Sequence, residues 1–259
     1  MYRRTMAIAL LLALTLTACG GPARPPMPAG TPERFSDRTP HPWGSPAPSD
    51  YAVHGVDVSK FQGPIDWSQV ARSGISFAYI KATEGGDRAD EYFRENMRAA
   101  KRAGLPRGAY HFFYHCRPAS EQAQWFIAHV PREPGALPPV LDIEWTPTSP
   151  TCTLRRDAAT IRAEIATYLR IVGAHYGQRP VIYATLDFFH DNDLARLGPQ
   201  DFWLRTVAAH PRAAYPGQTW TFWQYTATGI VPGIRTDADI NTFAGSTADW
   251  QGWLATRRQ

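Results

Sequence analysis

Two acidic residues, Asp142 and Glu144, lie two positions apart in the short apolar segment 137–145. The β-branched residues and the prolines that bound the segment predict a buried strand. Residues two apart in a strand project to the same face, with Cα atoms about 6.6 Å apart. Two ionised carboxylates this close repel each other, so the pKa of one should rise, giving a protonated acid beside a base. The alternative for an isolated Asp-x-Glu pattern is an ion-paired loop.

Strands and helices alternate on both sides of this segment, which predicts a mainly parallel sheet. Strands are predicted within 54–62, 77–86, 108–114, 140–143, 180–184, 202–205, 219–225 and 238–243. Helices are predicted from 66 and over 90–103, 119–129 and 155–176. About eight strands in about 200 residues predict a single irregular (β/α)8 TIM-like barrel, closed last strand onto first. Fewer helices are expected in the second half, and the chain shows no internal repeat or second domain.

The active site of a parallel barrel lies at the C-terminal ends of its strands. Four acids are predicted at such ends, namely Asp57, Asp142, Glu144 and Asp239. Closing the barrel should place Asp57 beside Asp239, with the other pair facing them across the mouth. Such a ring suits glycoside cleavage, in which one carboxylic acid protonates the leaving oxygen and a second group stabilises or attacks the anomeric carbon.

Aromatic side chains near the predicted mouth are candidates for holding sugars, because sugar faces lie on aromatic rings. These candidates are Tyr110, Trp145, Trp223 and Tyr225. Strand alternation predicts that Trp223 and Tyr225 face the same way, toward either the core or the groove. Glu84 follows another strand and is a further candidate, with a solvated loop charge as the alternative.

The composition excludes some classes of function. The formal charge of +4, from 27 basic and 23 acidic residues, is too small for nucleic-acid recognition, and the basic residues form no dense stripe. No set of His, Cys and Asp residues has metal-ligand spacing, so neither a metal nor a cofactor is expected. We expect a monomer.

The N-terminus is predicted to be a bacterial lipoprotein signal. Residues 1–18, the predicted signal peptide, combine two arginines with an apolar run over 7–16, and they are followed by Cys19, which completes a Leu-Thr-Ala-Cys sequence. This tetrapeptide resembles a lipobox, in which the cysteine carries the lipid. Residues 19–50 then predict a disordered, proline-rich tether, and 51–259 the catalytic barrel. The glycine after the cysteine favours the outer membrane, facing the periplasm; an ordinary signal peptide is the alternative.

Two cysteines remain for a disulfide in an oxidising compartment. Cys116 and Cys152 each follow a predicted strand, at 110–114 and 140–143, so neighbouring strand ends would bring them together. A bridge closing a loop of this length contributes about 3–4 kcal/mol in the chain-entropy description. Two unpaired thiols are the alternative.

Six segments in order resemble glycoside hydrolase family 25, the muramidases called Chalaropsis-type lysozymes. The resemblance covers about residues 54–245, and its motifs are His-Gly-Val-Asp-Val-Ser-Lys-Phe-Gln at 54–62, Lys-Ala-Thr-Glu-Gly at 81–85, Gly-Ala-Tyr-His-Phe at 108–112, Val-Leu-Asp-Ile-Glu at 140–144, Trp-Gln-Tyr at 223–225 and Asp-Ile-Asn-Thr-Phe at 239–243.

The resemblance implies hydrolysis of the β-1,4 bond between N-acetylmuramic acid and N-acetylglucosamine in peptidoglycan glycan strands. Glu144 would be the general acid. Asp142 would be its partner, either as nucleophile or as the group that orients the substrate's acetamide. Asp57 and Asp239 would shape the subsite and tune the acid, and Tyr110 would contact the reacting sugar.

The sequence also departs from the family pattern. Residues 203–207 read Trp-Leu-Arg-Thr-Val, where the family often has Trp-x-Ala-x-Tyr, which puts sugar stacking there in doubt. The two cysteines look like the form of the family found in Gram-negative bacteria. Alternative functions are a peptidoglycan-binding barrel without catalysis, which would not need an acid pair, and a hydrolase of another glycan such as chitin.

Overall fold

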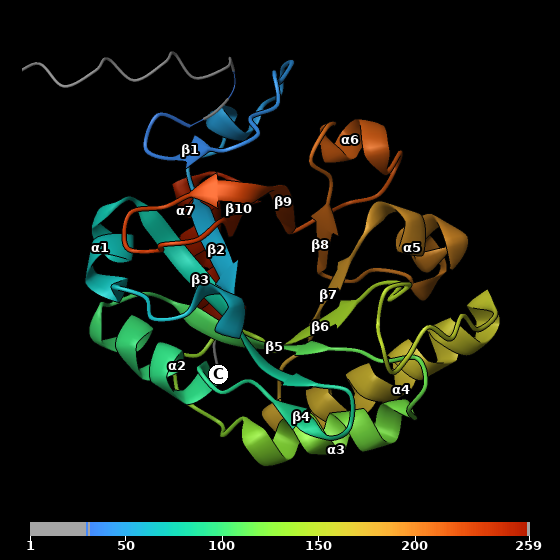
Figure 1. The fold of residues 1–259 in the computed structure, drawn as a ribbon. Coiled ribbons are helices and arrows are strands. Elements are labelled where there is room, and N and C mark those ends of the chain that lie inside the picture. The colour runs from blue at the N-terminus through green and yellow to red at the C-terminus, as the bar shows by residue number, and fades with distance from the viewer. Residues whose placement is uncertain (1–29, 31, 258–259) are drawn as a thin grey trace, which may run out of the picture.

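Eight strands close into a barrel in the computed structural model, which describes residue 30 and residues 32–257 (Figure 1). In order around the barrel they are β2 (His54–Val58), β3 (Ile75–Glu84), β5 (Arg107–Phe112), β6 (Val140–Ile143), β7 (Val181–Ala184), β8 (Phe202–Arg205), β9 (Phe222–Ile230) and β10 (Ala238–Phe243). Neighbours from β2 to β9 are parallel. Strand β10 is antiparallel to both β9 and β2 and closes the barrel. The prediction of a single, mainly parallel α/β barrel is confirmed.

Helices are present at all four predicted positions, and after residue 176 the described chain adds two short helices and one of 11 residues. The helices are α1 (Trp67–Arg72), α2 (Phe93–Arg102), α3 (Ala119–His129), α4 (Ala158–Tyr176), α5 (Leu186–Asp191), α6 (Pro211–Ala214) and α7 (Thr247–Arg257). Three 3-10 turns, η1 (Pro48–Asp50), η2 (Lys60–Gln62) and η3 (Leu194–Leu197), and the two-residue strands β1 (Ser36–Asp37) and β4 (Arg88–Ala89), complete the described chain. No helix in this described part is long and apolar enough to span a membrane.

Strand alternation separates two apolar layers. One set of side chains packs between the strands and the surrounding helices, as Ile80 of β3 does in the same cluster as Phe126 of α3. The other set fills the barrel interior, where Phe77 of β3 lies 5.1 Å from Phe222 of β9 between ring centroids. Because side chains alternate along each strand, every second residue of a strand points into the barrel.

Helix α7 was not predicted, and it closes the barrel at the N-terminal ends of the parallel strands. Trp250 and Leu254 are four positions apart, so they lie on one face of the helix, and both are buried. The Trp250 ring lies 5.2 Å from each of the rings of Phe77 and Phe243. This aromatic packing determines where the helix lies.

A disordered tether was predicted over residues 19–50. The prediction is wrong for residues 32–50, which the structure describes and which pack on the barrel. Strand β1 pairs antiparallel with β9, and Phe35 is buried. The Trp43 ring contacts the Trp223 ring, with centroids 5.1 Å apart. The segment is therefore held by a few aromatic anchors, which a composition rich in Pro, Ala, Gly and Ser does not reveal. The signal peptide, Cys19 and the start of the tether lie outside the described residues.

The predicted disulfide is confirmed. Cys116 and Cys152 are bonded, with Cα atoms 5.7 Å apart. Cys116 follows β5 and Cys152 follows β6, which are neighbouring parallel strands, so their C-terminal loops meet as expected. The bond joins two loops on the same side of the barrel as Glu144.

Candidate active site

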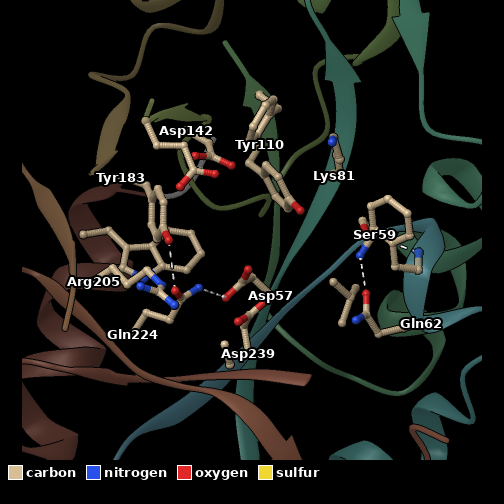
Figure 2. Close-up of a pocket in the computed structure, with 16 residues that line it drawn as sticks. Asp57, Ser59, Gln62, Lys81, Tyr110, Asp142, Tyr183, Arg205, Gln224 and Asp239 are labelled. Carbon is tan, nitrogen blue, oxygen red and sulfur yellow. Dashed lines mark hydrogen bonds between the residues drawn. The ribbon is translucent and has the colours of Figure 1, made fainter. Parts of the chain in front are cut away.

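All four predicted acids line one cavity at the C-terminal ends of the parallel strands (Figure 2). The cavity has a volume of about 470 Å³. The side chains that line it belong to Asp57, Val58, Ser59, Phe61, Gln62, Lys81, Tyr110, Phe112, Asp142, Glu144, Tyr183, Trp203, Arg205, Gln224, Ala227 and Asp239. They lie at or near the C-terminal ends of the parallel strands, in the turn after β2, or at the start of the antiparallel β10.

The Asp57 carboxylate is fixed by two side-chain amides. Its Oδ2 accepts hydrogen bonds from Asn241 Nδ2 at 2.8 Å and from Gln224 Nε2 at 3.0 Å. Each amide is oriented from behind, because the Trp203 indole donates to Asn241 Oδ1 at 2.8 Å and the Tyr183 hydroxyl donates to Gln224 Oε1 at 2.9 Å. Both amides must therefore present N–H groups to Asp57, and these favour its ionised form. Burial outweighs them and raises the pKa of Asp57 to about 6.

Glu144 follows β6 and is the candidate acid with the most suitable protonation behaviour. Burial raises its pKa to about 7, against the opposing charge of Arg205. Burial and then the charge of Glu144 also raise the pKa of Asp142 well above its usual range. One oxygen of Asp142, Oδ1, is buried without a hydrogen-bond partner. This pair therefore holds a proton near neutral pH, which is the condition for a general acid.

Asp239 reaches the rim by a different route from the one predicted. It stands at the start of β10, not at its end, and lies opposite Asp57 in the antiparallel β10–β2 ladder. Because β10 runs against its neighbours, its first residues meet their last ones. The predicted adjacency of Asp57 and Asp239 is thus confirmed, while the predicted position at a C-terminal strand end is wrong. Burial and the nearby Asp57 charge raise the pKa of Asp239 well above its ordinary value.

Tyr110 of β5 lines the cavity as predicted, whereas Glu84 stands behind its wall. The Glu84 carboxylate pairs with Lys81 Nζ at 2.6 Å and accepts a hydrogen bond from the Tyr114 hydroxyl. Lys81 itself lines the cavity and lies 4.5 Å from the centre of the Phe112 ring. Glu84 therefore does not line the cavity and is linked to it through its ion pair with Lys81, while its contact with substrate stays a prediction.

Three of the four predicted sugar-binding aromatics face away from the cavity. Trp223 and Tyr225 do share one direction, but it is the outward one: the Trp223 indole donates to the Thr206 carbonyl at 2.8 Å, and the Tyr225 hydroxyl lies 3.2 Å from His54 Nδ1. Trp145 is buried outside the barrel and donates to Asp191 Oδ2 at 2.8 Å. For these three the prediction of substrate contact is wrong, because the residue between Trp223 and Tyr225, and likewise Glu144, takes the inward position.

Residues absent from the predicted site share a simple signal. Gln224 lies between two aromatics in β9, and Tyr183, Trp203 and Arg205 occupy every second position of β7 and β8. Once Asp142 and Glu144 are assigned to the interior, the same alternation applied to each strand finds these residues. Phe61 of η2 has no such signal; it lines the cavity while 73% of its surface is exposed.

Among residue 30 and residues 32–257, no group of three or more His, Cys, Asp or Glu side chains is arranged to hold a metal ion. His111 is a core residue, as the aromatic strand around it suggests. Its ring nitrogens pair with Thr83 Oγ1 at 2.8 Å and Gln122 Oε1 at 3.1 Å.

Several known proteins are similar to this chain in sequence or in fold. YegX of Escherichia coli O6:H1 is 36% identical over 215 residues, covering 80% of this chain and 75% of YegX. Lysozyme M1 of Streptomyces globisporus is 38% identical over 213 residues, covering 76% of this chain and 69% of that enzyme. The solved structure of a family 25 glycosyl hydrolase from Bacillus anthracis superposes with a TM-score of 0.72 at 32% identity, covering 78% of this chain and 94% of that one.

The family assignment rests on the folded barrel. Residues 56–234 match the family described as glycosyl hydrolases family 25. The matched range begins within β2, one residue before Asp57, and includes Asp142 and Glu144, while Asp239 lies just beyond it. The barrel, its acid-lined cavity and these matches together show that the chain belongs to glycosyl hydrolases family 25.

Proposed function

We propose that the protein is a lysozyme that hydrolyses the β-1,4 bond between N-acetylmuramic acid and N-acetylglucosamine in peptidoglycan. The observation that carries this proposal is the set of four acids in one cavity, with the pKa of Glu144 raised to about 7. The similarity of this chain to lysozyme M1 supports the choice of peptidoglycan over other glycans.

Glu144 is the general acid in this proposal. It donates its proton to the glycosidic oxygen as the bond from that oxygen to the anomeric carbon breaks. Asp142 is the partner, either attacking the anomeric carbon or orienting the substrate's acetamide for that attack. Water then attacks the anomeric carbon, the bond from that carbon to the Asp142 or acetamide oxygen breaks, and the proton that the water loses passes to Glu144.

Asp57 and Asp239 shape the subsite on the opposite wall. The two amides that fix Asp57 are themselves held by Trp203 and Tyr183, so its carboxylate has a defined position before substrate arrives. A fixed negative group suits the positive charge that develops at the anomeric carbon in the transition state. Tyr110 of β5 lines the same cavity and, in this proposal, contacts the reacting sugar.

Digestion of purified sacculi tests the proposal. The wild-type protein should release fragments with N-acetylmuramic acid at the new reducing end, identified by mass after borohydride reduction. Glu144→Gln should lower the rate by about 10³-fold, as expected for loss of a general acid. Glu95→Gln, on the exposed face of α2, is the matched control and should retain full activity. Binding of sacculi without cleavage by the wild type would instead identify a peptidoglycan-binding barrel, and cleavage of chitin alone would identify another substrate.

We infer further that the protein is a monomer anchored by lipid on Cys19, in the outer membrane and facing the periplasm. The support is the sequence Leu-Thr-Ala-Cys that ends at Cys19 after a short apolar run. Cells fed an alkyne-labelled fatty acid should yield labelled wild-type protein and unlabelled Cys19→Ser protein. Label in both proteins would contradict the lipid anchor.

A further inference from the structure

Among the described residues, Arg205 is the basic residue of the cavity that has no ion-pair partner within 4.0 Å. It is the last residue of β8, and its neighbour across the β8–β9 ladder is Gln224, which holds Asp57. Its backbone is fixed, because its carbonyl accepts a hydrogen bond from the Tyr215 hydroxyl at 2.6 Å. Figure 2 shows the Arg205 side chain on the Tyr183 and Gln224 side of the cavity.

The two basic residues in the cavity wall differ in their pairing. Lys81 is neutralised by Glu84 at 2.6 Å. Within the described chain, Arg205 makes no ion pair within 4.0 Å, and its guanidinium makes no hydrogen bond, although four acids line the same cavity. Of these four acids, Asp57 already accepts hydrogen bonds from Asn241 and Gln224.

An unpaired guanidinium beside a binding cavity is suited to an anion. Its five N–H donors match the two oxygens of a carboxylate, and such charge-assisted pairs are about twice as strong as neutral hydrogen bonds. A peptidoglycan strand offers carboxylates only on its muramyl units. The lactyl ether carries one when the stem peptide has been removed, and the stem peptide carries others when it is present.

We propose that the Arg205 guanidinium binds a carboxylate of the muramyl unit in the cavity, so that this chain selects glycan by the acidic group on that unit. The proposal rests on the proposed lysozyme function, because that function places a muramyl unit next to Glu144.

The proposal is tested by measuring, with NMR titration, how tightly each of three sugars binds to the Glu144→Gln protein. N-acetylglucosamine is the neutral probe, N-acetylmuramic acid carries the lactyl carboxylate, and N-acetylmuramyl-L-alanyl-D-glutamate carries stem carboxylates. At least one acidic probe should bind about tenfold more tightly than N-acetylglucosamine. Adding Arg205→Ala should abolish this preference, and Arg205→Lys should retain part of it. The acidic probe that benefits identifies which carboxylate is bound.

The control is Arg212→Ala, which removes an exposed charge on α6 and should leave the preference unchanged. Equal affinity for all three sugars, or a preference that survives Arg205→Ala, would overturn the proposal. So would an equal loss of affinity for all three, because Arg205 would then act only through the acids or the fold. Failure of the proposed function appears separately, as no cleavage of sacculi by wild-type protein, and the titration does not depend on cleavage.

Discussion

The rim and the floor of this barrel are built from the same strands and differ completely in chemistry. The floor is the inward-facing aromatic cluster of Phe77, Phe222 and Phe243, closed by Trp250 of α7, with ring centroids 5.1 to 6.3 Å apart. The rim is the ring of Asp57, Asp142, Glu144, Arg205 and Asp239 that lines the cavity. A step of two residues along a strand leads from one layer to the next.

The contrast shows how the apolar floor changes the protonation of the acids above it. The floor excludes water from below, so the carboxyl groups above it lie partly in a low-dielectric environment. Burial is accordingly the largest cause of the raised pKa of Asp57, Asp142, Glu144 and Asp239. Stability is therefore concentrated in the floor and reactivity in the rim, and substitutions should separate the two.

Asp142→Asn should give the largest effect, and it should be on rate alone. We expect kcat on sacculi to fall by about 10³-fold, equivalent to about 4 kcal/mol of transition-state stabilisation. The free energy of unfolding should stay the same or rise, because the substitution removes a buried carboxyl group beside Glu144. Urea denaturation and reducing-end release measure the two quantities. A variant that is both inactive and destabilised by more than about 2 kcal/mol would break the separation of rim and floor.

Phe222→Ala should give the opposite result, a large loss of stability with little loss of intrinsic rate. The ring is fully buried among Phe77, Trp203 and Trp253. Truncation should cost about 3–5 kcal/mol of the free energy of unfolding. At a temperature where the variant is folded, kcat should stay within about threefold of the wild-type value. A threefold change in kcat corresponds to less than about 1 kcal/mol of activation free energy. Phe222→Leu, which keeps most of the volume, should cost less, and an equal cost for both would contradict the packing argument.

The pH dependence of stability sharpens the comparison, because a rim acid with a raised pKa stabilises the folded state only while it is protonated. The contribution of Glu144 is fully present below about pH 4.5 and is lost as pH rises to about 7. The free energy of unfolding of Glu144→Gln, relative to wild type, should therefore increase by about 1 kcal/mol per pH unit across this range. This slope is less than the full value of ~1.4 kcal/mol per pH unit because part of the Glu144 side chain remains in contact with water.

The comparison of Glu144→Gln with wild type removes the titration of the buried histidines from this measurement. Burial lowers the pKa of His54 to about 4 and of His111 to about 3, so both histidines destabilise the fold as pH falls below about 6.5. Their contributions cancel in the difference between Glu144→Gln and wild type. A difference that is flat between pH 4.5 and 7 would mean that Glu144 has an ordinary pKa in the folded protein.

Phe61→Ala should give the smallest effect, on substrate affinity alone. The ring lines the cavity yet is 73% exposed, on a turn in which Ser59 N–H donates to Gln62 Oε1 at 2.9 Å. Loss of one aromatic contact of about 1 kcal/mol should raise KM about fivefold, with kcat and melting temperature unchanged. Phe61→Trp should preserve KM. An unchanged KM in Phe61→Ala would exclude the ring as a sugar platform.

Local sequence patterns were enough to place the catalytic candidates but not all of the residues around them. Asp142 and Glu144 stand out because burying two carboxyl groups in an apolar strand lowers the stability of the fold, so their presence indicates a functional site. The direction of Trp223 and Tyr225 is not visible in the same way, since an alternating strand fits either phase when both faces are buried. Gln224, between them, is the inward residue only because the barrel closes with this phase.

The sequence by itself determined the order of the eight barrel strands and of the helices up to residue 176, the alternation within each strand, the acidic pair and the cysteine pair. These features depend on residue spacing and on neighbours along the chain. Only the tertiary structure decided that β10 runs antiparallel, that residues 32–50 pack on the barrel and that Arg205 faces the acids without a close partner. Those outcomes depend on contacts between residues far apart in the chain, where packing in three dimensions selects among arrangements that local spacing leaves equal.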